Sequence, residues 1–165
     1  MRVDFFNNTC VEGIRKDKQF GICDEQDGTK AYTDKDNQEK WIASVNNESS
    51  REVTFTAIDN CLRIMKPDSK DIESTCDGML TFDDGVFFVE LKNQKESWIP
   101  QAKSQLENTI RLFLENHPDC KKKFRKAFAC NKKHPSYRVI ESEDQKRFFD
   151  QFGFRFDINA IIKVK

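Results

Sequence analysis

The stretch of sequence that decides the fold reads Cys-Asp-Gly-Met-Leu-Thr-Phe at 76–82, Asp-Asp-Gly at 83–85 and Val-Phe-Phe-Val-Glu-Leu-Lys at 86–92. Two apolar, β-prone runs separated by an Asp-Gly pair predict a β-hairpin, because a type I′ turn needs positive φ at both central residues. If Asp84 and Gly85 are the turn residues, Lys92 lies opposite Asp77 on the neighbouring strand. We therefore expect the two ends of this stretch to lie side by side.

The hairpin brings charged side chains to one face of the sheet. Side chains alternate between faces with a period of two, so Asp77, Glu90 and Lys92 share a face. The opposite face is expected to carry Leu80, Phe82, Phe87, Val89 and Leu91, with Val89 and Leu91 buried. Directly opposed Cβ atoms are about 4.5–5.5 Å apart, a span that a divalent cation can bridge.

This set of residue types suits metal-assisted chemistry on a phosphate. Mg²⁺ prefers one or two carboxylates together with waters and phosphate oxygens, so Asp77 and Glu90 are the candidate metal ligands, with Mn²⁺ as a substitute ion. Lys92 is placed to activate water or to stabilise charge on the phosphate. The alternative is an ordinary solvent-exposed strand whose Glu and Lys alternate outward.

At these positions the chain resembles the PD-(D/E)xK nuclease superfamily, whose signature is an Asp on one strand and an acidic-x-Lys triplet on the next. Asp77 matches the first residue and Glu90-Leu91-Lys92 the triplet, while Cys76 stands where the family has proline. The resemblance implies a metal-dependent phosphodiesterase in which both acids bind the metal and the Lys helps to activate water. It also implies a restriction-endonuclease-like α/β core, with a central mixed sheet flanked by helices.

The segment before the hairpin is expected to supply the first helix of that core. Ser49-Ser50-Arg51-Glu52 reads as a capping box, and apolar residues follow at helical spacing until Lys66-Pro67. A strand at 53–56 is the rival interpretation, because these residues are β-prone. On the expected helix, Glu52 and Asp59 are candidates for a further acid at the site.

A second helix is predicted after the hairpin. Pro100 stands in its first turn, and a buried stripe runs from Ile99 to Phe113. The superfamily often carries a Gln on this helix, and RecB-type members have a Tyr four residues later. Gln105 resembles that Gln and is expected to orient groups in the site, but Thr109 occupies the Tyr position.

The remainder of the chain completes the expected order α-β-β-α-β with one additional helix and strand. The run 124–130 alternates as a strand that pairs parallel with the hairpin, 142–152 reads as a helix ended by Gly153, and 154–164 is extended. We expect a single domain over 1–165, in which an irregular N-terminal extension, 1–48, packs on a nuclease-like core, 49–165.

Charge and composition restrict how a polyanion can be bound. Lys plus Arg number 28 and Asp plus Glu also number 28, so nucleic-acid binding must rest on a local basic patch. The candidate nucleic-acid-binding residues are expected near the site at one edge of the sheet. They are Lys121, Lys122, Lys123, Lys132 and Lys133.

Cysteines, histidines and hydropathy give weaker indications. The six cysteines lack zinc-type spacing and are expected to be reduced, buried apolar side chains. His117 and His134 each precede a proline and are expected at a helix end and in a loop. No apolar run is long enough for a membrane span and the start is no secretory signal, so no membrane partner and a cytoplasmic location are expected.

The expected function is hydrolysis of nucleic-acid phosphodiester bonds, with DNA as the expected substrate class. A homodimer is expected if both strands of a duplex are cut. One alternative is a catalytically degenerate binding or regulatory module on the same scaffold, which the zero net charge and Thr109 favour. Another is a small interaction protein whose sheet merely displays charges.

Overall fold

The expected hairpin lies at the centre of the fold. In the computed structural model, which describes residues 3–165, strand β5 (Gly78–Phe82) pairs antiparallel with β6 (Gly85–Lys92). Every residue of β6 is buried, including its polar end. Such a strand belongs to the middle of a sheet that is covered on both faces.

The hairpin is extended on both sides into a mixed five-stranded sheet with the order β4-β5-β6-β7-β8. Strand β4 (Thr54–Ala57) pairs antiparallel with β5. Strands β7 (Phe124–Asn131) and β8 (Arg155–Ile158) continue parallel from β6. The predicted parallel pairing of 124–130 with the hairpin is confirmed, and the carboxyl ends of three strands meet at one edge.

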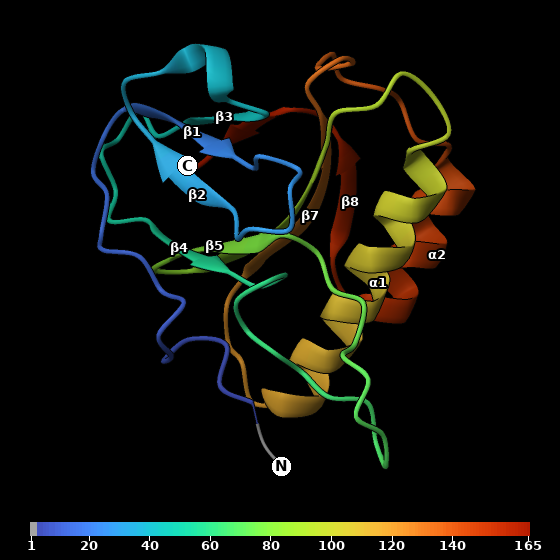
Figure 1. Cartoon of the computed structure of the whole chain (residues 1–165). Helices are drawn as coiled ribbons and strands as arrows, with labels where there is room; N and C mark the ends of the chain where they lie inside the picture. The colour runs from blue at the N-terminus through green and yellow to red at the C-terminus, as the bar shows by residue number, and fades with distance from the viewer. Residues whose placement is uncertain (1–2) are drawn as a thin grey trace.

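Two helices cover one face of this sheet. Helix α1 (Ile99–Asn116) connects β6 to β7, and α2 (Ser142–Phe152) connects β7 to β8 (Figure 1). The predicted start of α1 with proline and the predicted end of α2 at Gly153 are confirmed, since Gly153 adopts the left-handed conformation at φ 72°. The helices and the sheet enclose an aromatic core that includes Phe88, Phe113 and Phe154.

The sequence suggested an irregular N-terminal lobe, but this part of the chain forms a second sheet. Strands β1 (Gln19–Cys23), β2 (Tyr32–Asp34), β3 (Ala43–Asn46) and β9 (Ile161–Lys163) are arranged in the order β2-β1-β3-β9, with a short 3-10 helix at Gln38–Lys40. Side chains from this sheet pack with Leu80, Phe87 and Leu91 on the face away from the helices. The chain therefore has three layers, with helices, a central sheet and a smaller sheet.

The helix expected over residues 49–66 is absent, and the rival interpretation as a strand is correct. Ser50 has a φ of 49°, and the buried Asn47 side chain bonds both the backbone N and O of Arg51, so this segment turns instead of starting a helix. Strand β4 then places the Phe55 ring against the backbone of Gly78, where a Cβ would lie 2.3 Å from it. Tertiary pairing here reinforces the β preference of the residues.

The hairpin turn differs from the expected one without changing the faces. Phe82 pairs with Gly85, so the loop residues are Asp83 and Asp84, and neither has a positive φ. Gly85 is required in the strand because the Phe82 ring covers it, with an added Cβ only 2.0 Å from the ring. The register shifts by two residues, and an even shift keeps each side chain on its expected face.

Two of the six cysteines are not reduced side chains as expected. Cys10 and Cys61 form a disulfide, whereas Cys23, Cys76, Cys120 and Cys130 are free. The 51-residue separation hid this pair in the sequence. It forms because the segment before β1 lies along β4, where Cys10 O accepts a hydrogen bond from Ala57 N.

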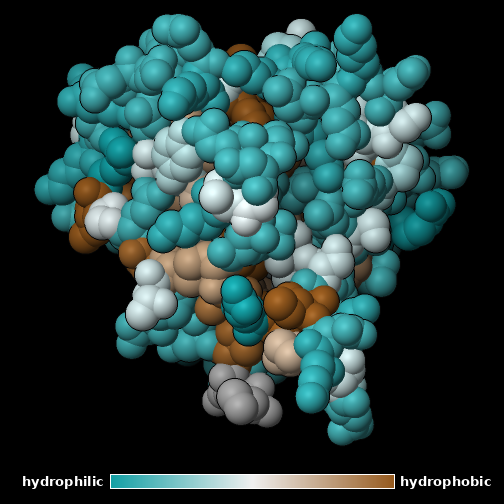
Figure 2. Space-filling view, in the orientation of Figure 1, coloured by the Kyte–Doolittle hydropathy of each residue, from teal (hydrophilic) through white to brown (hydrophobic). Residues whose placement is uncertain are grey.

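The surface agrees with the high charge content of the chain. Within residues 3–165, no helix is both long enough and apolar enough to cross a lipid bilayer. The face in Figure 2 is mostly hydrophilic, and its larger apolar area lies in the lower half of the view.

Candidate active site

The predicted charged residues meet at the carboxyl end of β6. Asp77 precedes β5, and the register continued by one residue sets it opposite Glu90. Glu90 Oε1 accepts a hydrogen bond from Asp77 N at 3.1 Å, and Asp77 Oδ2 accepts one from Leu91 N at 2.7 Å. The two carboxyl groups therefore lie on the same side of the sheet, facing the helices.

Lys92 and Gln105 complete the group. Lys92 Nζ lies 3.1 Å from Glu90 Oε2 and donates a hydrogen bond to Gln105 Oε1 at 2.9 Å. Gln105 is held in turn, because its Nε2 donates to Thr75 O at 3.4 Å. Thr109, at the position of the family's Tyr, links the helix to the strand by accepting a hydrogen bond from Cys76 N at 2.7 Å.

Burial is what separates this group from ordinary surface charges. Asp77, Glu90 and Lys92 are 7%, 2% and 7% exposed, so the interpretation as a solvent-exposed strand is wrong. Burying an ionised group costs several kcal/mol unless it is paired. Three buried ionisable side chains therefore indicate a functional site, and not residues that only stabilise the fold.

The environment of the two carboxyl groups raises the pKa of both, so it disfavours their being ionised together. Burial raises the pKa of Asp77 to about 7, against the lowering effect of the hydrogen bond from Leu91 N. Burial and the Asp77 charge raise the pKa of Glu90 well above its usual value, and Lys92 offsets this only in part. Both shifts have the same direction, so burial and the proximity of the two carboxyl groups favour protonation of the pair.

Two further acids stand near the pair. Asp24 follows β1 and Asp59 follows β4, both half-buried, and both charges raise the pKa of Asp77. Burial raises the pKa of Asp59, while the Lys92 charge lowers it. Asp59 was expected on a helix that does not form. Asp24 was not expected at the site, because only the packing of the second sheet brings that residue here.

Glu52, the other acid proposed on the expected helix, does not join the group. It is exposed, and its Oε1 lies 3.4 Å from Lys16 Nζ in a surface ion pair.

The chain supplies two candidate carboxylate ligands for Mg²⁺ at this site. Among residues 3–165, no three His, Cys, Asp or Glu side chains are grouped closely enough to hold a metal ion. Mg²⁺ needs only one or two protein carboxylates when waters and substrate phosphate supply the other ligands. Asp77 and Glu90 are two neighbouring buried carboxyl groups on one face of the sheet, so they meet this requirement.

The candidate lysines do not form one patch. Lys132 and Lys133 follow β7 at the site edge, where Lys132 N donates to Lys92 O at 2.9 Å. Lys121, Lys122 and Lys123 precede β7, and Phe124 pairs with Gly85 at the opposite end of the sheet. Lys122 Nζ instead binds the carbonyl oxygens of Phe82 and Asp83 at the hairpin turn. The expectation that all five lie near the site is therefore wrong for 121–123.

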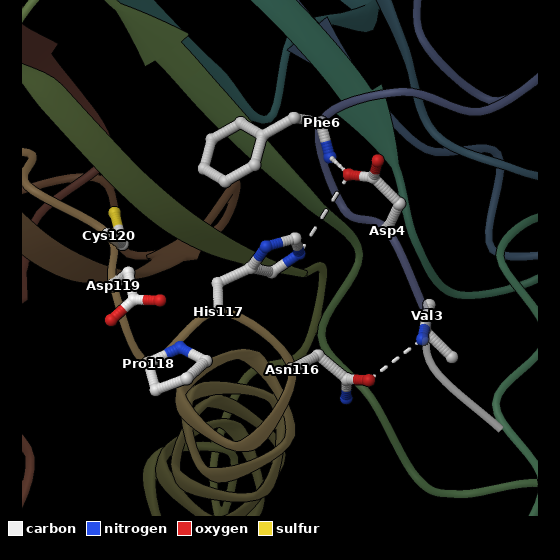
Figure 3. Close-up of a pocket in the computed structure, with 8 residues that line it drawn as sticks. All are labelled: Val3, Asp4, Phe6, Asn116, His117, Pro118, Asp119 and Cys120. Carbon is white, nitrogen blue, oxygen red and sulfur yellow. Dashed lines mark hydrogen bonds and ion pairs between the residues drawn. The ribbon is translucent and has the colours of Figure 1, made fainter.

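The hollow in Figure 3 lies at the far end of α1 and has a structural explanation. His117 caps α1 as predicted, and its Nε2 accepts a hydrogen bond from Phe5 N at 3.0 Å. Val3 N donates to Asn116 Oδ1 at 2.7 Å, so both residues fasten the N-terminal segment to the helix. This arrangement is remote from the carboxyl ends of the parallel strands.

Comparison with protein-family models, curated proteins and solved structures finds no match to this chain.

Proposed function

We propose that the chain is a metal-dependent nuclease that hydrolyses nucleic-acid phosphodiester bonds at Asp77, Glu90 and Lys92. The observation that carries the proposal is the convergence of these three charged side chains, each less than a tenth exposed, with Gln105 beside them. Active sites collect strongly shifted carboxyl pKa values next to a cation in this way.

The fold supports this proposal from the hairpin onward. The order β5, β6, α1, β7 follows the order expected for a restriction-endonuclease-like core, with α2 and β8 as the additional helix and strand. The core departs from the family pattern at its start, because β4 replaces the leading helix. The proposal therefore rests on the site and not on a complete match of the fold.

Each residue has a role that its contacts allow. Asp77 and Glu90 would hold Mg²⁺, or Mn²⁺ in its place. When bound, the metal neutralises developing phosphate charge and lowers the pKa of bound water. Lys92 donates to Glu90 and Gln105, and is placed to donate to a phosphate oxygen in the same way. Gln105 positions Lys92 through its own bond to Thr75 O.

The proposed partner is nucleic acid, with DNA as the first substrate to test and no membrane involved. A homodimer would supply the two sites needed to cut both strands of a duplex. The cytoplasmic location stays a prediction, and the Cys10–Cys61 disulfide opposes it, because the cytosol keeps thiols reduced.

A catalytically degenerate binding module is the second candidate. Both Glu90 oxygens are already engaged within the chain, Oε1 by Asp77 N and Oε2 by Lys92 Nζ. A network that is satisfied in this way needs no metal to hold its geometry. A metal-dependent cleavage activity would therefore distinguish the nuclease from the binding module.

The experiment is a cleavage screen of plasmid, linear duplex, single-stranded DNA and RNA with Mg²⁺ or Mn²⁺. The Glu90→Gln variant keeps the shape of the side chain and should lose at least about 100-fold in cleavage rate, because a metal ligand and its charge are removed. Lys92→Ala should also lower the rate but leave metal binding in place.

Asp157→Asn is the matched control, since Asp157 is 8% exposed and pairs with Arg155 on β8. This substitution removes a buried acid outside the site, so the variant should cleave like the parent. A Glu90→Gln protein that cleaves as fast as the parent would overturn the proposal.

A further inference from the structure

A second feature lies at the edge of the sheet that holds the candidate active site. The loop after β7, the last residue of β8 and Trp98 at the start of α1 border a hollow with a volume of about 310 Å³. The start of the β7 loop is joined to the β6 end, because Asn131 Nδ2 donates to Gln94 O and Lys132 N donates to Lys92 O. In sheets with parallel strands, ligands bind in the crevice outside the carboxyl ends.

The lining of this hollow is rich in hydrogen-bond donors. Lys133, His134, Ser136, Tyr137 and Arg138 form its polar wall, with Trp98 and Ile158 as apolar neighbours and no carboxylate among the lining residues. His134 Nε2 donates to Lys95 O, which holds the wall against the loop that follows β6. A concave surface with cations, hydroxyl groups and no acid suits an anion.

Lys133 and Arg138, the Lys and Arg side chains in this wall, have no acidic partner among residues 3–165. Arg111 and Arg155 elsewhere in the chain form ion pairs with Glu73 and Asp157. Lys133 and Arg138 are exposed, and within residues 3–165 their side chains form neither an ion pair nor a hydrogen bond. The backbone N of Arg138 is fixed by Ile158 O at 2.9 Å, so the guanidinium is carried on an anchored segment. An unpaired Arg on a fixed backbone is a favourable phosphate ligand.

We propose that this hollow binds a backbone phosphate of the nucleic-acid substrate, through Lys133 and Arg138, beside the site of cleavage. The inference rests on the proposed function and adds to it a contact that holds the strand at the carboxyl edge of the sheet. Ser136 and Tyr137 supply further donors to the same phosphate group, while His134 stays bonded to Lys95 O. Lys121–Lys123, at the other end of the sheet, are not part of this contact.

The test is binding of a labelled single-stranded oligonucleotide, measured by fluorescence anisotropy in EDTA over a series of KCl concentrations. The Lys133→Gln/Arg138→Gln double variant should bind at least about fivefold more weakly near 0.1 M KCl. Its plot of log affinity against log salt should be shallower by about 0.7 per lost phosphate contact.

Arg63→Gln/Lys66→Gln is the matched control, because it removes the same two charges from exposed positions in the loop before β5. It should bind like the parent. Equal losses in the two double variants, or no loss in the first, would overturn the inference.

Inorganic phosphate distinguishes a strand contact from a free-anion site. In the parent it should shift the amide NMR signals of residues 131–138, and it should not shift them in the Lys133→Gln/Arg138→Gln variant. Loss of the phosphate effect without loss of oligonucleotide affinity would contradict the proposal. Because these measurements contain no divalent metal and record no cleavage, they can fail while the cleavage screen succeeds, and the reverse.

Discussion

The Asp77 carboxyl group connects the candidate chemistry to the stability of the fold. Its pKa rises from 3.8 to about 7 on folding, mainly through burial. A group with a raised folded pKa contributes stability that is fully present below the unfolded pKa and is lost as pH rises through the folded pKa. The metal-free protein should therefore lose stability between about pH 4 and pH 7, and the shift of Glu90 acts in the same direction.

The first prediction is that Asp77→Asn reduces this pH dependence. At about pH 8 and in EDTA the variant should be more stable than the parent, on the order of 1–3 kcal/mol, because a buried charge next to Glu90 is removed. Urea denaturation between about pH 4 and pH 8 measures the difference. Parallel stability curves for the two proteins would show that Asp77 is not desolvated as described.

The second prediction concerns Lys92, the cation that accompanies Glu90. Lys92→Met should destabilise the fold by about 1–3 kcal/mol, since it leaves a buried acid without its partner. The double variant Glu90→Gln/Lys92→Met should recover most of that loss, because neutral groups need no counter-charge. If the double variant is as unstable as the two single changes added together, the two side chains are not coupled.

At the scale of residues, the sequence predicts what local geometry determines. Period-two alternation and one turn suffice to place Asp77, Glu90 and Lys92 on a common face, and the even error in register leaves that result unchanged. Gln105 was expected at the site only from the resemblance to the nuclease superfamily, and it lies there, bonded to Lys92. Asp24 could not be found in this way, because its approach depends on how two sheets pack.

The hairpin element has a steric requirement that gives the third prediction. Gly85→Ala should destabilise the fold by about 1–3 kcal/mol, because the Phe82 ring occupies the space of a Cβ. Gly13→Ala is the control, since nothing lies within 4 Å of its added Cβ. Thermal or urea unfolding compares them, and equal effects would mean that the ring can move aside without cost.

At the scale of elements, the outcome depends on whether local signals agree. Helix α1 has proline at its start and a long apolar stripe, and helix α2 has a glycine at its end, so both were predicted correctly. Residues 49–66 carry conflicting signals, with a capping pattern followed by β-branched residues. A local contact, the Asn47 side chain bonded to Arg51, and a tertiary one, the Phe55 ring against Gly78, decide that conflict.

At the scale of the whole molecule, the second sheet and the disulfide depend on contacts between distant parts of the chain. Strand β9 at the C-terminal end pairs with β3, and Cys10 bonds Cys61. No local sequence pattern predicts either the strand pairing or the disulfide. Strand β9 belongs to the sheet from which Asp24 approaches the candidate site.

The fourth prediction follows from the disulfide. Cys10→Ser/Cys61→Ser should lower the free energy of unfolding by about 3–4 kcal/mol, because a bond that closes a loop of 51 residues restricts the unfolded chain. Urea denaturation of the variant and of the parent under non-reducing conditions measures the loss. Cys120→Ser, which changes a free and partly exposed cysteine, is the control and should have little effect.

Asp77 and Glu90 are proposed to form a divalent-metal site, and thermal unfolding during a Mn²⁺ titration tests this proposal. A ligand that binds only the folded state stabilises it by about 2.7 kcal/mol at one hundred times its Kd. The parent and Asp157→Asn should therefore show a rising Tm as Mn²⁺ is added, while Asp77→Asn and Glu90→Gln should show little or no rise. An unchanged Tm in the parent, or an equal rise in all four proteins, would contradict the account.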